Sequence, residues 1–258
     1  MIAKEMFSRR WFLATLLVIA GAALCARLGI WQLDRLQQRR AANAHYIEMQ
    51  AESALQLPKD SSLDLASMEY RAISVSGNYD FAHQVAIRNQ SYKDENGYHL
   101  LTPLVFDNGK AVLVDRGWIP AIGNAQPSEW SKYDQAQAAT VHGILRLSRD
   151  KADFTGETDP PLEPGQTRLD VWTFPNIPRI QQQMTYQLLP VYIQLDPDPN
   201  ATNPPIPYQP EVDLTEGPHQ GYAIQWFSFA TILIVGYPFY VRRHRTSDPT
   251  EPMTEEVK

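Results

Sequence analysis

Two long apolar stretches lie near opposite ends of the chain and enclose a polar middle region. The later one, Gln220–Val241, contains no charged residue, and as a helix rising about 1.5 Å per residue it is about 33 Å long, enough to cross a hydrocarbon core of about 30 Å. The earlier one, Trp11–Ala26, continues past Arg27 into a second apolar run. Residues 11–33 can also span if Arg27 lies near the interface, where its side chain reaches the headgroups. The pattern predicts transmembrane helices at 11–33 and 219–241.

The middle region, residues 34–218, has mostly the pattern of short strands. The clearest local signal is Asp107-Asn108-Gly109 between two apolar runs, because Asn-Gly supplies the positive φ angles that a tight hairpin turn requires. Alternation of apolar and polar residues predicts the other strands. The expected strands are 71–77, 84–88, 100–106, 110–115, 140–147, 168–173 and 191–195.

Two helical segments and one extended segment complete this region. Residues 41–52 are helix-like and are expected to prolong the first span. A short helix is predicted at 178–188, where Ile180, Met184 and Leu188 recur every four residues. Residues 197–210 contain six prolines, which remove backbone donors and hold the chain extended, so we interpret them as a tether to the second span. The predicted fold class is membrane α+β, with two transmembrane helices bracketing a β-rich, mostly antiparallel extramembrane domain.

Basic residues beside the spans indicate the topology, because Lys and Arg near a span tend to remain on the cytoplasmic side. The relevant residues are Lys4, Arg9 and Arg10 before the first span and Arg242, Arg243 and Arg245 after the second. They predict cytoplasmic tails at 1–10 and 242–258 and an exterior, periplasmic domain at 34–218. One cluster opposes this orientation, since Arg35, Arg39 and Arg40 lie on the predicted exterior side.

The first apolar stretch also permits a second interpretation. Ser8–Leu13 resembles a twin-arginine export signal, and Ala20-Gly21-Ala22 offers a small-x-small cleavage site. Cleavage there leaves an exported domain anchored only by its tail, with an unrelated ligand. The apolar character extends well past this site to Leu33, which favours a retained span.

Composition excludes several classes of function. The one cysteine, Cys25, rules out an internal disulfide framework and Cys-based metal clusters. A net charge of −6 disfavours nucleic acid as a partner. The chain has no phosphate-binding glycine loop, no His-Glu-x-x-His and no Gly-x-Ser-x-Gly. These motifs therefore give no indication of hydrolysis or nucleotide use.

His219 is the candidate functional residue, because it lies at the outer mouth of the second span. A neutral imidazole there can bind an iron or a headgroup, whereas the alternative is an interfacial residue in an aromatic belt. At helical spacing, His219, Tyr222 and Trp226 share one face, which Ala223 and Ala230 leave open to a flat apolar ring or to the other helix.

Several blocks of sequence resemble those of one family. Gly29-Ile30-Trp31-Gln32-Leu33-Asp34-Arg35-Leu36 is similar to the signature that leaves the first span in the surfeit locus protein one family. Val112–Pro120 resembles that family's Arg-Gly-Trp stretch, and His219–Phe227 resembles its entry to the second span. The smaller blocks that agree are Tyr70-Arg71, Gly77–Tyr79, Gly97–His99 and Leu101–Leu104.

This resemblance implies an assembly factor, or chaperone, rather than an enzyme. It implies that the protein serves haem–copper cytochrome c oxidase in the bacterial cytoplasmic (inner) membrane. It implies haem a as a transient cofactor, His219 as the ligand of its iron, and Tyr222 and Trp226 as further binding residues. The implied partners are oxidase subunit I, the haem a synthesis machinery and the lipid bilayer. Arg88 and Arg116 are weaker candidates for contacts with haem propionates. The competing hypothesis is a cofactor-free chaperone or scaffold for oxidase subunits.

Overall fold

The chain forms two compact units. The computed structural model describes residues 2–60, 62–152 and 155–244, so most of the predicted tail at 242–258 lies outside the described residues. One unit combines Met1–Ala44 with Asp213–Lys258, and the other is His45–Val212.

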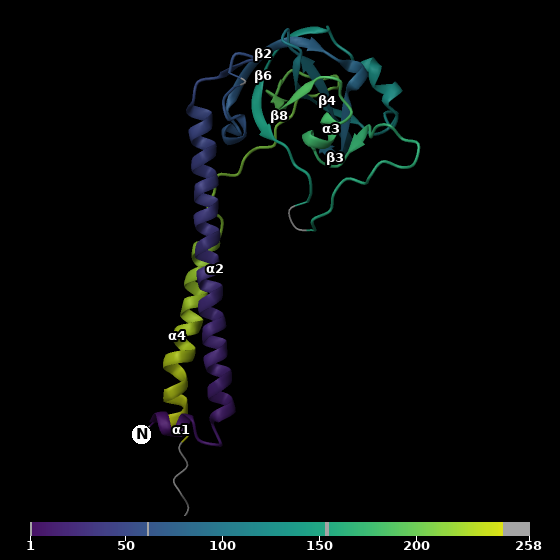
Figure 1. Cartoon of the computed structure of the whole chain (residues 1–258). Helices are drawn as coiled ribbons and strands as arrows, with labels where there is room; N and C mark the ends of the chain where they lie inside the picture. Colours follow the sequence, from purple (N-terminus) through teal and green to yellow (C-terminus); the bar gives the residue numbers. More distant parts are fainter. Residues whose placement is uncertain (1, 61, 153–154, 245–258) are drawn as a thin grey trace, which may run out of the picture. The chain divides into compact units, whose positions relative to one another are not determined.

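The first unit is a helical hairpin. It contains α1 (Ile2–Met6), most of α2 (Phe12–Ala51) and α4 (His219–Arg243). Helices α2 and α4 lie side by side (Figure 1). They run antiparallel, because the Thr15 hydroxyl near the start of α2 lies 2.8 Å from the Tyr237 hydroxyl near the end of α4, while Gln32 further along α2 meets His219 at the start of α4.

Both α2 and α4 are long and apolar enough to cross a membrane, judged by length and composition. The prediction of two apolar helices around a β-rich domain is confirmed. Helix α2 is longer than the predicted span of residues 11–33, since it continues without a break through the helical extension expected at 41–52.

Small residues line the buried sides of the two helices. Ala22 and Gly29 are buried on α2, and Ala223 and Ala230 are buried on α4. A Cβ atom added to Gly29 would lie 2.8 Å from the ring of Phe227. Such small residues allow two helix backbones to approach closely where lipid tails provide no hydrophobic driving force.

The second unit is a β-domain. Among its described residues, one sheet has the strand order β1-β2-β6-β8-β5-β4-β3-β7, and a further pairing of β2 with β4 closes a barrel. Most of the pairings are antiparallel, and the exceptions are β1–β2, β3–β7 and β5–β8. The strands are β1 (Leu55–Leu57), β2 (Ala72–Tyr79), β3 (Val85–Tyr92), β4 (Glu95–Val105), β5 (Lys110–Pro120), β6 (Ala138–Leu147), β7 (Val171–Trp172) and β8 (Gln187–Leu195).

Most of the strand predictions are confirmed. The Asn-Gly signal lies between β4 and β5 as expected, with Gly109 at φ +76°. The helix predicted at 178–188 is wrong in its second half, because α3 covers only Ile177–Gln181 and Leu188 pairs with Ala111 in the sheet. Pairing with β5 overrides the helical spacing there, since strand β8 fills its backbone hydrogen bonds within the sheet. The strand expected at 168–173 is shorter in the structure, where only Val171–Trp172 (β7) is strand.

Strand β5 lies at the centre of the domain. Val112 and Val114 point into one buried cluster with Leu104 and Ile193, whereas Leu113 belongs to another cluster beside α3. Because successive side chains in a strand point to opposite faces, a strand covered on both sides shows a continuous apolar run. Part of the proline-rich segment also lies on this strand, where Ile206 and Trp118 exchange two backbone hydrogen bonds. The short 3₁₀ helices are Leu65–Met68, Phe81–His83 and Pro127–Tyr133.

Candidate functional site

The helical unit pairs His219 with a buried amide side chain. The Nδ1 atom of His219 lies 2.8 Å from Oε1 of Gln32. Gln32 is only 9 % exposed and lies on the buried side of α2, while His219 is the first residue of α4 and is half-buried. The imidazole at the start of α4 is therefore held by a residue from the other helix, α2.

The hydrogen bond determines which nitrogen of His219 is available. A carbonyl oxygen can only accept, so Nδ1 carries the proton and donates it to Gln32. In the neutral ring Nε2 then has a free lone pair, which is the form that binds a metal. Gly217 places no side chain beside this nitrogen, since an added Cβ would lie 3.6 Å from Nε2. These observations fit a haem ligand, because the donor atom is of the right type and its ring is oriented by a second residue.

The chain before α4 is fastened to α2, and this places His219. Arg40 forms two hydrogen bonds to the Glu216 carboxylate, at 2.7 and 2.8 Å. Arg39 lies 3.3 Å from the Asp213 carboxylate and also donates to the Thr215 carbonyl. Single exposed ion pairs contribute little, but here several contacts join the same two segments. The carboxylates of Asp213 and Glu216 also balance the charges of Arg39 and Arg40, two of the three arginines that opposed the predicted topology.

The aromatic residues predicted beside His219 are placed differently from one another. Tyr222 is 48 % exposed, and Trp226 is half-buried with its ring 6.0 Å from that of Phe229 at an angle of 84°. No hydrogen bond or ring contact joins either residue to His219 within the described hairpin. The sequence left this face of α4 open either to a flat apolar ring or to the other helix. Ala223 and Ala230 are buried, so the structure shows this face packed against the other helix.

The two arginines considered for propionate contacts lie in the β-domain. Arg116 is 1 % exposed, and its guanidinium lies over the rings of Phe81 and Tyr79 at 4.9 and 5.6 Å. Burial lowers the pKa of Arg116, and the side chain donates to the carbonyl of Tyr133. It is therefore a structural residue. Arg88 is exposed and donates to the Thr173 hydroxyl at 3.0 Å.

Sequence reasoning did not identify Gln32 as the partner of His219. The signal was present, because a polar side chain within an apolar helix is costly unless another group satisfies it. Gln32 also lies inside the block Gly29–Leu36 that carries the family resemblance. What was missing was the pairing of the two helices.

Comparison with known proteins gives the family of this chain. The model of the SURF1 family matches residues 19–231, which is most of the chain. This chain belongs to the SURF1 family. The match includes both Gln32 and His219.

Individual family members share only about a quarter of their residues with this chain. An uncharacterized SURF1-like protein of Mycobacterium bovis is 28 % identical over 96 % of this chain and 93 % of its own length. Surfeit locus protein 1 of Mus musculus is 25 % identical over 91 % of this chain and 76 % of its own. A SURF1-like protein of Caenorhabditis briggsae is 23 % identical over 87 % of this chain and 74 % of its own. The similarity therefore extends over most of the helical and β-rich parts of the SURF1-like chain.

Proposed function

We propose that this SURF1-family protein is an assembly factor for haem–copper cytochrome c oxidase. Helices α2 and α4 cross the bacterial cytoplasmic membrane, and the β-domain lies on the periplasmic side. Family membership supports the general role, and the two apolar helices support the membrane location. The hydrogen bond from Thr15 to the carbonyl of Met6 and the contact of Thr15 with Tyr237 support a retained first span. Both would be lost if an export signal ended at Ala22.

In this proposal His219 holds haem a while it is delivered to oxidase subunit I. The observation that carries the ligand role is the 2.8 Å contact between His219 Nδ1 and Gln32 Oε1. It leaves Nε2 with a free lone pair for the iron. A single protein ligand on the iron allows release to a site that offers stronger coordination. Tyr222, which is exposed, and Trp226 provide apolar surface on the same helix. The haem a synthesis machinery is the proposed source.

Absorbance spectroscopy tests the ligand role. The full-length protein, purified in detergent from cells that make haem a, is expected to show a haem absorbance band that His219→Ala loses. His244→Ala is the matched control, because His244 caps the other end of the same helix and its Nδ1 lies 2.9 Å from the Tyr240 carbonyl. Equal haem content in His219→Ala and the wild-type protein would reject the assignment.

A cofactor-free chaperone for oxidase subunits is the second candidate. The burial of Ala223 and Ala230 favours it, because the helix face predicted to receive a flat ring is occupied by packing. The two functions differ in their dependence on the imidazole. Oxidase activity in membranes of cells that carry His219→Ala falls if the histidine delivers haem, and it stays at the wild-type level if the protein only supports the subunits.

A further inference from the structure

The β-domain contains a cavity that is separate from the His219 site. Its volume is about 520 Å³, and its lining comes from strands β3, β4, β5, β6 and β8 together with the segments that follow β6, β7 and β8. All the lining residues belong to the unit His45–Val212. Cavities of this size commonly hold small organic ligands. Neither the family resemblance nor the proposed haem site gives this cavity a role.

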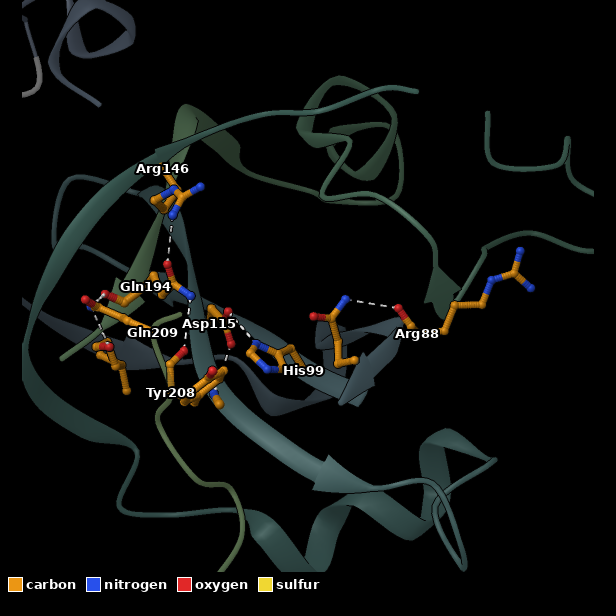
Figure 2. A network of polar contacts seen from close by, with 10 residues as sticks. Arg88, His99, Asp115, Arg146, Gln194, Tyr208 and Gln209 are labelled. Atoms are coloured by element: carbon orange, nitrogen blue, oxygen red, sulfur yellow. Dashed lines mark hydrogen bonds and ion pairs between the residues drawn. The ribbon is translucent and has the colours of Figure 1, made fainter. Parts of the chain in front are cut away.

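A buried histidine and a buried aspartate form one wall. His99 on β4 and Asp115 on β5 are 7 % and 5 % exposed, and Nδ1 of His99 lies 2.8 Å from Oδ2 of Asp115 (Figure 2). The other carboxylate oxygen accepts the Gly117 N–H at 3.0 Å. The carboxylate is therefore engaged by the protein on both oxygens. Nε2 of His99 has no hydrogen-bond partner among the residues that the structure describes.

Protonation of His99 would make this nitrogen a hydrogen-bond donor, and the surroundings of the ring favour the protonated form. Burial disfavours the charged imidazole, but the charge and the hydrogen bond of Asp115 outweigh burial and raise the pKa of His99. Protonation places a second N–H on the ring, at Nε2. An Asp-held imidazolium in a cavity can donate to a bound acceptor, and it does so most strongly when that acceptor is negatively charged.

Arg146 on β6 supplies a second cationic group to the same cavity. Its guanidinium is held in place by Gln194, which accepts from Nη1 at 3.2 Å, and by Glu69, which lies 3.3 Å from Nε (Figure 2 shows the bond to Gln194). Gln194 in turn donates to the Tyr208 carbonyl at 3.2 Å. Nη2 of Arg146 has no hydrogen-bond partner within the described ranges. The network thus holds the guanidinium in place and leaves its Nη2 atom able to donate hydrogen bonds to a ligand.

The remaining walls are partly apolar. Leu101, Phe174, Pro175 and Tyr208 line the cavity. A second arginine, Arg149, also lines it, whereas the carboxylate that accompanies Arg146, Glu69, is not part of the lining. The cavity is therefore lined by cationic donors, by an apolar surface and by Asp115, whose two carboxylate oxygens are already engaged by His99 and by the Gly117 N–H. This combination matches a ligand with one anionic group and an apolar body.

We propose that this cavity binds a small carboxylate with an apolar body about the size of an aromatic ring. The ligand's carboxylate accepts hydrogen bonds from His99 Nε2 and from the guanidinium of Arg146, and its body lies against Phe174 and Leu101. A planar carboxylate suits this place because a guanidinium can present two parallel N–H groups to it. One negative charge is sufficient, because Asp115 and Glu69 already balance part of the positive charge.

The test measures binding of 4-fluorobenzoate to the full-length protein in detergent by ¹⁹F NMR line broadening. The neutral isostere 4-fluorobenzamide, measured with the same protein and detergent, reports binding that does not depend on charge. A fragment of this size is expected to bind in the millimolar range. We expect saturable broadening of the carboxylate signal and at least about tenfold weaker binding of the amide, because a hydrogen bond to a charged group is lost.

Two variants locate the binding. Arg146→Gln removes the cationic donor and is expected to weaken binding by about tenfold. Ser91→Trp places a bulky ring at an exposed strand position on the cavity wall and is expected to abolish binding without changing any charge. The matched controls are Lys59→Gln, which removes an exposed positive charge elsewhere, and Ser76→Trp, at an exposed position of β2 outside the cavity. Both controls are expected to bind as the wild type does.

Three results would overturn the proposal. They are the absence of saturable binding up to about 50 mM, well above the millimolar range expected for such a fragment, equal binding of the amide, and unchanged binding in Ser91→Trp. If Arg146→Gln does not fold, the Ser91→Trp variant decides alone, since it leaves the polar network intact.

Discussion

His219 and Gln32 are 187 residues apart in the chain, yet Nδ1 of the histidine lies 2.8 Å from Oε1 of the glutamine. The bond connects the start of α4 to the buried side of α2. It satisfies a polar side chain on the buried side of α2 and at the same time selects the tautomer of the imidazole. Gln32 is therefore a positioning residue for His219.

Replacing Gln32 by leucine is expected to weaken the proposed haem binding without removing His219, the proposed ligand. Loss of a residue that orients a ligating histidine typically lowers metal affinity by about 10–100-fold. Gln32→Glu keeps an acceptor for Nδ1 and is expected to retain most of the affinity. The measurement is the haem absorbance of the purified protein during titration. Equal affinities in Gln32→Leu and the wild type would show that the contact does not position the ring.

The close contact between Gly29 and Phe227 predicts that a larger residue at 29 separates the helices. A Cβ there would lie 2.8 Å from the Phe227 ring, so Gly29→Leu is expected to lower the free energy of unfolding by about 1–3 kcal/mol through overpacking. Gly236→Leu is the control, because a Cβ at 236 meets nothing within 4 Å. Thermal unfolding in detergent measures both. The prediction fails if the two variants unfold at the same temperature.

Gly117 in the Arg-Gly-Trp block has a backbone conformation that only glycine adopts easily. Its φ is +113°, and a Cβ would lie 2.2 Å from the Ile206 carbonyl oxygen. Gly117→Ala is expected to destabilise the β-domain by about 3 kcal/mol or more, since both strain and a backbone clash are involved. Gly109→Ala, at φ +76° in open space, is expected to cost only about 1–2 kcal/mol. Chemical denaturation compares the two, and similar losses would contradict the clash.

The His99–Asp115 pair predicts a pH dependence of stability. The folded protein raises the pKa of His99 above its ordinary value of 6.5, chiefly because Asp115 outweighs the effect of burial. A raised pKa means that the folded state binds the proton more tightly. This contribution is therefore complete below pH 6.5 and is lost as the pH rises through the folded-state value.

The variant His99→Gln is expected to flatten this part of the stability profile. Glutamine retains a donor for the Asp115 carboxylate but does not titrate. The control is His142→Gln on the exposed side of β6, which is expected to leave the slope unchanged. Unfolding in detergent is measured at a series of pH values from below to above 6.5. A His99→Gln profile parallel to that of the wild type would assign the slope to other groups.

Local pattern was sufficient for the elements that depend on neighbouring residues. The uncharged run Gln220–Val241 predicts a long apolar helix, and the Asn108-Gly109 turn predicts the β4–β5 hairpin; both are found. His219 was singled out because it stands where an apolar helix begins. Each of these inferences uses only the periodicity or turn chemistry of a short segment.

Pairings between distant segments required the tertiary structure. The β4–β5 register places Asp115 opposite Leu101, and a register shift between His99 and Leu101 places His99 opposite Trp118. Within this irregular part of the hairpin, Nδ1 of His99 lies 2.8 Å from Oδ2 of Asp115. Such a bulge inserts a residue that no local pattern marks, and it redirects the side chains beside it. The β2–β4 pairing that closes the barrel is likewise a long-range contact.

The sequence alone determined that this protein has two apolar helices, a β-rich domain and a histidine at the start of the second helix, because these features follow from local periodicity and composition. Only the tertiary structure decided that Gln32 holds His219 and that His99, Asp115 and Arg146 line one cavity. These groups are far apart in the chain, and their meeting depends on how helices pack and strands register. That information is carried by the whole set of contacts rather than by any one segment.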